Sequence, residues 1–207
     1  MYTVSHARDA GDFVLLPPEV IADRRPGGAS AFSGTTWKDP AMTTAHAVRA
    51  ATIKDLSDIR RLVNDLAEYE QSADAVVATL EDFRHALFPD GAAPATFCEV
   101  AEADGAVVGF ALWFLSFSTW TGRHGIWLED LYVEPEHRGS GLGRALLSAL
   151  ARKAAENGWA RVEWTVLDWN APSLAFYRSL GARPQDEWTT YRLDGDGLAH
   201  LAAPREA

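Results

Sequence analysis

The stretch Arg138-Gly139-Ser140-Gly141-Leu142-Gly143 is the most informative part of this chain, because it combines three glycines with a helix start. An apolar segment, 126–135, precedes it, and an amphipathic helix is predicted to begin near Gly141. Glycines let a backbone approach a ligand closely, and successive N–H groups in such a turn point toward the same place. The free N–H groups and partial positive charge of a helix N-terminus favour an anion. The stretch therefore predicts a phosphate-binding loop between a strand and a helix.

The spacing of these glycines excludes two common phosphate loops. A P-loop needs Lys and then Ser or Thr after its last glycine, and no such pair follows Gly143. A dinucleotide-binding loop needs a third glycine where this chain has Arg144 or Leu146. The pattern present is Arg-x-x-Gly-x-Gly. An ordinary strand-to-helix turn that uses glycine for its geometry is the structural alternative.

The composition is typical of a globular protein without disulfides. The 207 residues are 47% hydrophobic and 23% charged, which is enough to bury a sizeable core. The single cysteine, Cys98, excludes an internal disulfide, and we expect it to be a small buried side chain. No secretory signal or membrane-spanning apolar run is present, so we expect a cytoplasmic protein without a membrane partner. The net charge of −10 disfavours nucleic acid and favours a cationic partner.

The first part of the chain differs from the rest. Residues 1–41 contain turn signals such as Pro17-Pro18 and Pro26-Gly27-Gly28, and too few apolar residues for a core. We interpret them as a loose N-terminal extension that is either disordered or not translated, since Met42 is a second candidate start. Residues 42–207 are predicted to form the folded domain.

Hydrophobic periodicity predicts alternating strands and helices in this domain. The predicted strands cover 48–53, 97–103, 107–117, 126–133, 162–167 and 188–193. The predicted helices cover 56–69, 79–89, 142–156 and 170–180. Asp104-Gly105 predicts a tight hairpin between the second and third strands. This order predicts an α/β fold of the α+β type, with a mixed, mostly antiparallel sheet, helices on both faces and a parallel strand pair around the helix at 142–156.

Several segments resemble the GNAT family of acyl-CoA-dependent N-acyltransferases, and within it the diamine (spermidine/spermine) acetyltransferases. These segments are 66–70, 108–111, 128–133, the glycine loop 138–143, and 169–177. The resemblance covers roughly residues 48–201 and keeps the family's order. It implies the GNAT fold, acetyl-CoA as co-substrate and a homodimer.

The resemblance also implies where acetyl-CoA binds. Backbone groups in the strand segment Leu131, Tyr132 and Val133 would hold the pantetheine arm like an added strand. The pyrophosphate would bind to the loop formed by Arg138, Gly139, Ser140, Gly141, Leu142 and Gly143. Arg138 would add a charge-assisted contact. Asn170 and Ser173 would contact the co-substrate, or would only cap the helix that begins there.

Two residues match the family's proton-transfer groups. An alkylammonium has a pKa near ~10.4 and must lose a proton before it attacks a thioester. Glu129 matches the general base, with an exposed strand glutamate as the alternative. Tyr177 matches the general acid for the departing thiolate, with an aromatic core position as the alternative. Direct attack on the thioester needs no acyl-enzyme, so Cys98 is not expected to be a nucleophile.

The acceptor site is expected beside these groups. Tyr69 and Glu70 match positions that line the family's amine site, or they are an ordinary helix end. Asp130 faces away from Glu129 in a regular strand, so it would reach the substrate only if the strand is bulged. With Glu68 and Glu129, these carboxylates would form an anionic cleft for a cationic small molecule. Aromatic rings that could flank a cation, or else pack in the core, are Trp120 and Tyr132.

The sequence thus predicts an acetyl-CoA-dependent N-acetyltransferase of a small primary amine, working by direct transfer. A diamine, a polyamine or a thialysine-like amino acid would fit, although the loop after Glu70 is less acidic than a dedicated binder of long polyamines would need. A peptide or protein N-acetyltransferase is one alternative. A non-catalytic acyl-CoA-binding regulatory module is another, but it would not need both Glu129 and Tyr177. His124 and His137 lack metal-ligand spacing and are interpreted as exposed loop residues, so no metal is expected.

Overall fold

The computed structural model describes residues 46–204, whose strands form one five-stranded sheet. The strands are β1 (His46–Ala50), β2 (Thr96–Ala103), β3 (Ala106–Ser118), β4 (Arg123–Val133) and β5 (Val162–Glu163). They lie in this order across the sheet, and only β4 and β5 are parallel. The mixed, mostly antiparallel sheet is therefore confirmed. The predicted extension, residues 1–41, lies outside the described residues.

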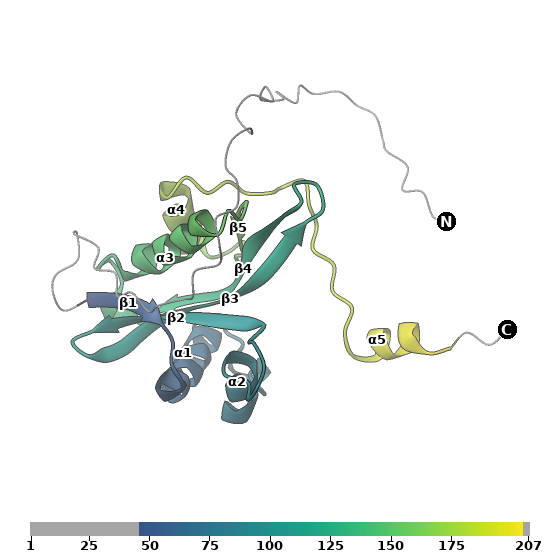
Figure 1. Ribbon diagram of the computed structural model, residues 1–207, viewed down its shortest axis with the longest axis horizontal. Coiled ribbons are helices and arrows are strands. Elements are labelled where there is room, and N and C mark those ends of the chain that lie inside the picture. The colour runs from purple at the N-terminus through teal and green to yellow at the C-terminus, as the bar shows by residue number, and fades with distance from the viewer. Residues whose placement is uncertain (1–45, 205–207) are drawn as a thin grey trace, which may run out of the picture. The chain divides into compact units, whose positions relative to one another are not determined.

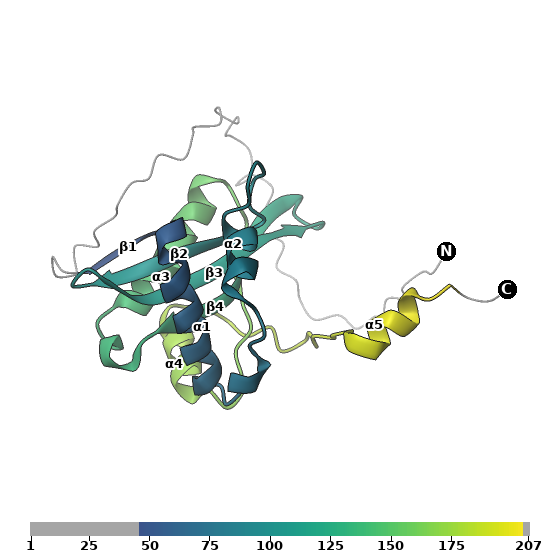
Figure 2. The same ribbon diagram turned by 90° about the horizontal axis from the view of Figure 1, so that it is seen from below.

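Helices cover both faces of the sheet, as Figure 1 and Figure 2 show. One face carries α1 (Leu56–Tyr69) and α2 (Leu80–Leu87), and the other carries α3 (Leu142–Glu156) and α4 (Ala171–Ser179). Short 3-10 turns lie at Ile53–Asp55, Ala73–Ala75 and Pro135–His137, and a last helix, α5, spans Gly195–Ala202. Within residues 46–204, no helix has the length and apolarity needed to cross a membrane.

The two helical layers bury two separate apolar clusters. Leu56, Ile59 and Leu62 recur at helical spacing on α1 and pack against Phe110 and Tyr132 of the sheet. On the other face, α3 packs its buried leucines and alanines against alternate residues of β1 to β4. Because β3 and β4 are covered on both faces, their middle parts are apolar on both sides. This packing fixes α1 on one face of β4 and α3 on the other.

An ion-pair network joins β1, β2 and the start of α1. The Arg49 guanidinium donates to both carboxylate oxygens of Asp55 at 2.7 and 2.8 Å, and to Oε1 of Glu102 at 2.6 Å. Asp55 is buried and also accepts hydrogen bonds from the backbone N–H and the hydroxyl of Thr52. The hydrogen bond from Arg49 is the main reason that the pKa of Asp55 is lowered to about 2.

We expect Asp55→Ala to lower the free energy of unfolding by about 3 kcal/mol, because it leaves the half-buried Arg49 without its main partner. The lowered pKa makes the contribution of Asp55 fully present above the ordinary carboxyl pKa near ~4, and lost as the pH falls through about 2. Urea unfolding at pH 7 and at acid pH checks both statements. Asp58→Ala is the control, since Asp58 is 45% exposed and its pairing with Arg61 is worth less than about 1 kcal/mol.

Two strand predictions were wrong. Only Val162 and Glu163 of the predicted strand 162–167 pair with β4, because the chain leaves the sheet after them. The predicted strand 188–193 has no regular structure, and its side chains are exposed, with Trp188 at 72% and Tyr191 at 92%. The alternating apolar residues of this segment are not part of a sheet, because no strand among residues 46–204 pairs with it. Helix α5, which follows, was not predicted.

Candidate active site

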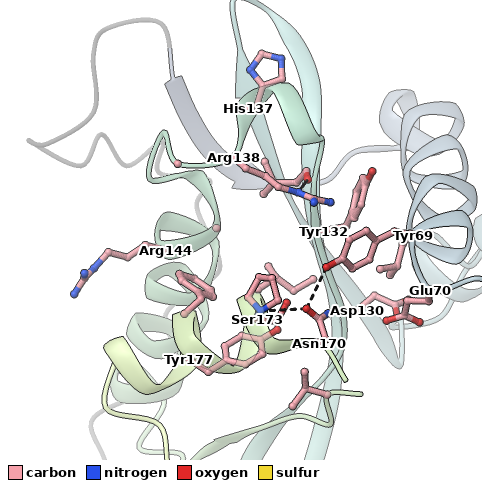
Figure 3. Close-up of a pocket in the computed structure, with 18 of the residues that line it drawn as sticks. Tyr69, Glu70, Asp130, Tyr132, His137, Arg138, Arg144, Asn170, Ser173 and Tyr177 are labelled. Atoms are coloured by element: carbon pink, nitrogen blue, oxygen red, sulfur yellow. Dashed lines mark hydrogen bonds between the residues drawn. The ribbon is translucent and has the colours of Figure 1, made fainter. Parts of the chain in front are cut away.

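A cavity of about 480 Å³ lies where β4 and β5 separate. Its walls come from the end of α1, the second half of β4, the glycine loop with the start of α3, and α4 (Figure 3). The predicted site residues that line it are Tyr69, Glu70, Glu129, Asp130, Leu131, Tyr132, Val133, Arg138, Gly139, Gly141, Gly143, Asn170, Ser173 and Tyr177. One cavity therefore brings together the predicted catalytic, acceptor and cofactor residues.

The second half of β4 offers free backbone groups to this cavity. The Glu134 N–H donates to the Val108 carbonyl of β3 at 2.9 Å, so the peptide groups of Leu131 and Val133 point to the opposite edge, away from β3. Of these groups, the Val133 carbonyl accepts a hydrogen bond from Arg138 Nε. The ladder to β5 involves only Ile126 and Trp127 at the other end of β4. The free edge is thus suited to accept an extended amide-containing chain as an added strand. Tyr132 lines the cavity with its ring, and its peptide carbonyl lies against β3.

The glycine loop has the backbone conformation of an anion cradle. Gly139 has φ +77° and Gly141, at the N-cap of α3, has φ +91°, a region that side chains rarely adopt. A Cβ on either residue would meet no atom within 4 Å, so these backbones are open to a ligand. Two loop residues do not line the cavity. Leu142 is buried in the core, and the Ser140 hydroxyl donates to the His137 carbonyl at 2.6 Å.

The Arg138 side chain lies over the cavity wall. Its Nε donates to the Val133 carbonyl at 2.9 Å, and its guanidinium carbon lies 4.7 Å from the Tyr69 ring centre and 5.4 Å from that of Tyr132 (Figure 3). These are cation–π distances. The cation that the Tyr132 ring contacts is therefore the Arg138 side chain. Trp120 does not line the cavity and is 87% exposed.

Helix α4 begins at a buried cap. Asn170 is 6% exposed, and its Oδ1 accepts hydrogen bonds from the Ser173 N–H at 3.2 Å and from the Tyr69 hydroxyl at 3.1 Å. The predicted capping role of Asn170 is confirmed. Further along the same helix, Tyr177 packs against Trp164 and Phe176 and lines the cavity. Burial, followed by the negative charge of Glu70, raises the pKa of Tyr177 to about 12, so its hydroxyl keeps its proton at neutral pH.

A β-bulge places the two adjacent carboxylates of β4. Asp130 is opposite Leu112 and Leu128 is opposite Trp113, so Glu129 has no partner on β3. The extra residue reverses the side-chain alternation: Leu128 faces α3, while Asp130 and Tyr132 face the side of α1. The conditional prediction that a bulge brings Asp130 to the site is therefore met.

The three carboxylates that line the cavity, Glu70, Glu129 and Asp130, differ in environment. Burial is the main reason that the pKa of Asp130 is raised to about 6, and the charges of Glu129 and Glu70 add to it. Burial also raises the pKa of Glu70. Glu129 is exposed, and its Oε2 accepts a hydrogen bond from the indole N–H of Trp127 at 3.1 Å. Among residues 46–204, none of these three carboxylates forms an ion pair, so their charge faces the cavity uncompensated.

The sequence interpretation missed or misjudged a few positions. His137 is half-buried and lines the cavity, so its interpretation as an exposed loop residue was wrong. Arg144, Thr165, Val166 and Phe176 also line the cavity. The position of Arg144, directly after the glycines, was the only signal that could have identified one of them. Glu68, expected in the anionic cleft, is exposed and is not part of the lining.

Comparison with known proteins decides the family. The family model described as "Acetyltransferase (GNAT) family" matches residues 57–182, which include every cavity-lining residue. The chain belongs to the GNAT family. This N-acetyltransferase is 38% identical over 166 residues to bovine (Bos taurus) thialysine N-epsilon-acetyltransferase, covering 75% of this chain and 96% of the relative. The predicted enzyme class and resemblance are confirmed.

A second curated relative matches less than half of this chain, and a solved structure matches most of it. L-ornithine N5-acetyltransferase NATA1 of Arabidopsis thaliana is 39% identical over 95 residues, covering 46% of this chain and 42% of the relative. An integron cassette protein from the mobile metagenome of V. cholerae is a solved structure with a TM-score of 0.65 and 25% identity, covering 78% of this chain and 100% of its own. The latter confirms the GNAT fold. GNAT acetyltransferases use acetyl-CoA as the acetyl donor.

Proposed function

We propose that this protein transfers the acetyl group of acetyl-CoA directly to a small primary amine. The observation that carries the proposal is the distribution of charge along one cavity. Arg138, Arg144 and His137 lie on the side of the glycine loop, whereas Glu70 and Asp130 lie on another (Figure 3). Glu129, which also lines the cavity, directly precedes Asp130 on β4. The first side suits the phosphates of a nucleotide thioester, and the second suits an ammonium group.

The residues present fit acetyl-CoA. The glycine loop has room for phosphate oxygens where side chains would stand. The peptide groups of Leu131 and the N–H of Val133 point to the free edge of β4 and could hold the pantetheine amides, whereas the Val133 carbonyl already accepts a hydrogen bond from Arg138. Ser173 and Asn170 lie beside this path at the cap of α4. When bound, acetyl-CoA supplies the activated acetyl thioester. All other chemistry proposed below belongs to side chains of this chain.

Glu129 is the proposed general base, and Tyr177 is the proposed general acid. Glu129 lies in the bulge of the strand whose free edge would hold the co-substrate, and its carboxylate is oriented by Trp127. It would accept a proton from the acceptor ammonium, directly or through water. Tyr177 faces the same cavity with its proton retained, so it can protonate the departing thiolate. Cys98 is buried in the other layer with a strongly raised pKa, which supports direct transfer without an acyl-enzyme.

The relatives support small amines as acceptors. Their names include thialysine and ornithine acetyltransferases, and both of these amino acids carry a primary amine at the end of the side chain. We propose that thialysine-like amino acids and short diamines are substrates, held by Glu70, Asp130 and the lining residue Tyr69. We also propose that the protein is a cytoplasmic homodimer. The exposed apolar side chains at 188–201 support an association between copies.

The experiment that tests the function is coenzyme A release from acetyl-CoA with a panel of acceptors. The panel contains putrescine, spermidine, thialysine, lysine, an aminoglycoside and a lysine-containing peptide. Turnover that is largest on one of the small amines supports the proposal. Turnover on the peptide alone would support a peptide or protein N-acetyltransferase, and acetyl-CoA binding without turnover on any acceptor would support a regulatory module.

We expect the KM for the amine to rise about tenfold when the pH falls from 7 to 5, because Asp130 loses its charge as the pH passes its pKa of about 6. The measurement is KM against pH at saturating acetyl-CoA. Asp130→Asn is expected to remove this pH dependence. The same variant should be more stable than wild type at pH 8, since a carboxyl whose pKa is raised on folding loses its stability contribution as the pH rises through that pKa. A wild-type KM that is constant from pH 7 to 5 would contradict the role of Asp130.

A further inference from the structure

The Tyr69 hydroxyl links the acceptor side of the cavity to the helix that carries Tyr177. Tyr69 is the last residue of α1, directly before Glu70, and it lies across the cavity from α4 (Figure 3). Its hydroxyl donates to Oδ1 of Asn170 at 3.1 Å. Asn170 lies 101 residues further along the chain, so this hydrogen bond ties two distant segments together.

The Asn170 oxygen is fully used by this arrangement. A carbonyl oxygen has two lone pairs, and Oδ1 accepts one hydrogen bond from Tyr69 and one from the Ser173 N–H of the first turn of α4. Because the Asn170 side chain is almost completely buried, no water is expected to replace the tyrosine without cost. The cap of α4 is thus set by a residue of α1 as well as by its own turn.

This cap begins the short helix that carries Tyr177. Asn170 and Tyr177 are seven positions apart, which places them on the same face of α4, and both line the cavity. A rotation or shift of the N-terminus of α4 would therefore move the Tyr177 hydroxyl relative to Glu70 and Asp130. The ring of Tyr69 is itself held by Arg138 on one side and by Trp169, whose ring centre is 6.1 Å away.

We propose that the Tyr69 hydroxyl is a positioning group, which holds α4 and thereby the acid Tyr177 in place against the acceptor carboxylates. This inference rests on the proposed function for the role of Tyr177. The hydrogen bond itself is a property of the free protein and is tested without turnover.

The test uses Tyr69→Phe, which keeps the ring and its contacts with Arg138 and Trp169 but removes the O–H. We expect kcat to fall about three- to tenfold, with the KM for the amine within about twofold of wild type. In a Tyr177→Phe background, the same substitution should have almost no further effect, because the group that Tyr69 positions is gone. An unchanged kcat in Tyr69→Phe, or an effect that simply multiplies with that of Tyr177→Phe, would overturn the inference.

Amide hydrogen exchange of the free protein is the second measurement. We expect the Ser173 amide and its neighbours in the first turn of α4 to exchange several-fold faster in Tyr69→Phe than in wild type, while α2 is unchanged. Tyr191→Phe is the matched control, since Tyr191 is almost fully exposed. Unchanged exchange in α4 would refute the tether. If wild type turned over no amine but Tyr69→Phe still accelerated exchange, the proposed function would fail and the tether would stand.

Discussion

Replacing Glu129 by Gln is expected to lower kcat by about 100- to 1,000-fold, in the lower part of the roughly 100- to 10,000-fold contribution of a general acid or base. The amide keeps the shape of the side chain and can still contact Trp127, but it cannot accept the ammonium proton. The KM for acetyl-CoA should stay within about twofold, because the glycine loop and the free edge of β4 are untouched. Steady-state kinetics with the best amine of the panel, from pH 6 to pH 9, measures both constants.

The adjacent carboxylate makes this experiment decisive. Glu136→Gln is the control, since Glu136 is exposed on the 3-10 turn after β4 and does not line the cavity. Asp130→Asn is expected to act mainly on the KM for the amine. If Asp130→Asn instead abolished kcat while Glu129→Gln kept it, the base would be Asp130, and the exposed Glu129 would serve only to attract the substrate.

Replacing Gly141 by Ala is expected to weaken binding of acetyl-CoA about 10- to 100-fold. An alanine is strained at φ +91°, so the loop would rotate the N–H groups that are aimed at the phosphates. Loss of a single hydrogen bond to a charged group costs about 1.5–3 kcal/mol, which gives this range of affinity. Isothermal titration with coenzyme A measures the effect without the need for an acceptor.

Gly105→Ala is the matched control for Gly141→Ala. Gly105 has φ +84°, and a Cβ there also meets no atom within 4 Å, but it lies in the turn between β2 and β3 away from the cavity. Both variants should lose about 1–2 kcal/mol of stability from backbone strain. Only Gly141→Ala should lose affinity for coenzyme A. Equal affinities in the two variants would show that the loop does not bind the phosphates through its backbone.

Much of the fold was predictable because its local signals agree with one another. The periodic leucines and isoleucine of α1, the Asp104-Gly105 turn and the cap at Asn170 each specify their own element. The glycine loop could be identified from its Arg-x-x-Gly-x-Gly pattern, since few residues other than glycine adopt the angles found at 139 and 141. These features depend on short-range physics, which a single sequence contains.

The rest depends on contacts between distant segments. The sequence marks Tyr69 and Asn170 separately, but nothing in it indicates that they form a hydrogen bond. The contacts of the Arg138 guanidinium with the rings of Tyr69 and Tyr132 likewise join segments that are far apart in the sequence, and no sequence pattern indicated them. In the segment 188–193 apolar and polar residues alternate as in a strand, but this pattern does not show whether a partner strand is available, and the structure has none for it among residues 46–204.

The bulge at Glu129 has a consequence for how this chain can change during evolution. Because side chains alternate along a strand, one extra residue is what lets Leu128 lie in the core on one face and Asp130 in the cavity on the other. Deleting Leu128 would place Glu129 opposite Trp113, toward the leucines of α3, whereas deleting Glu129 or Asp130 would restore regular pairing but remove one of the two carboxylates from the cavity. We therefore expect β4 to tolerate single substitutions better than the insertion or deletion of one residue. In an alignment of functional descendants, the stretch between Leu128 and the glycine loop should therefore carry no single-residue gap.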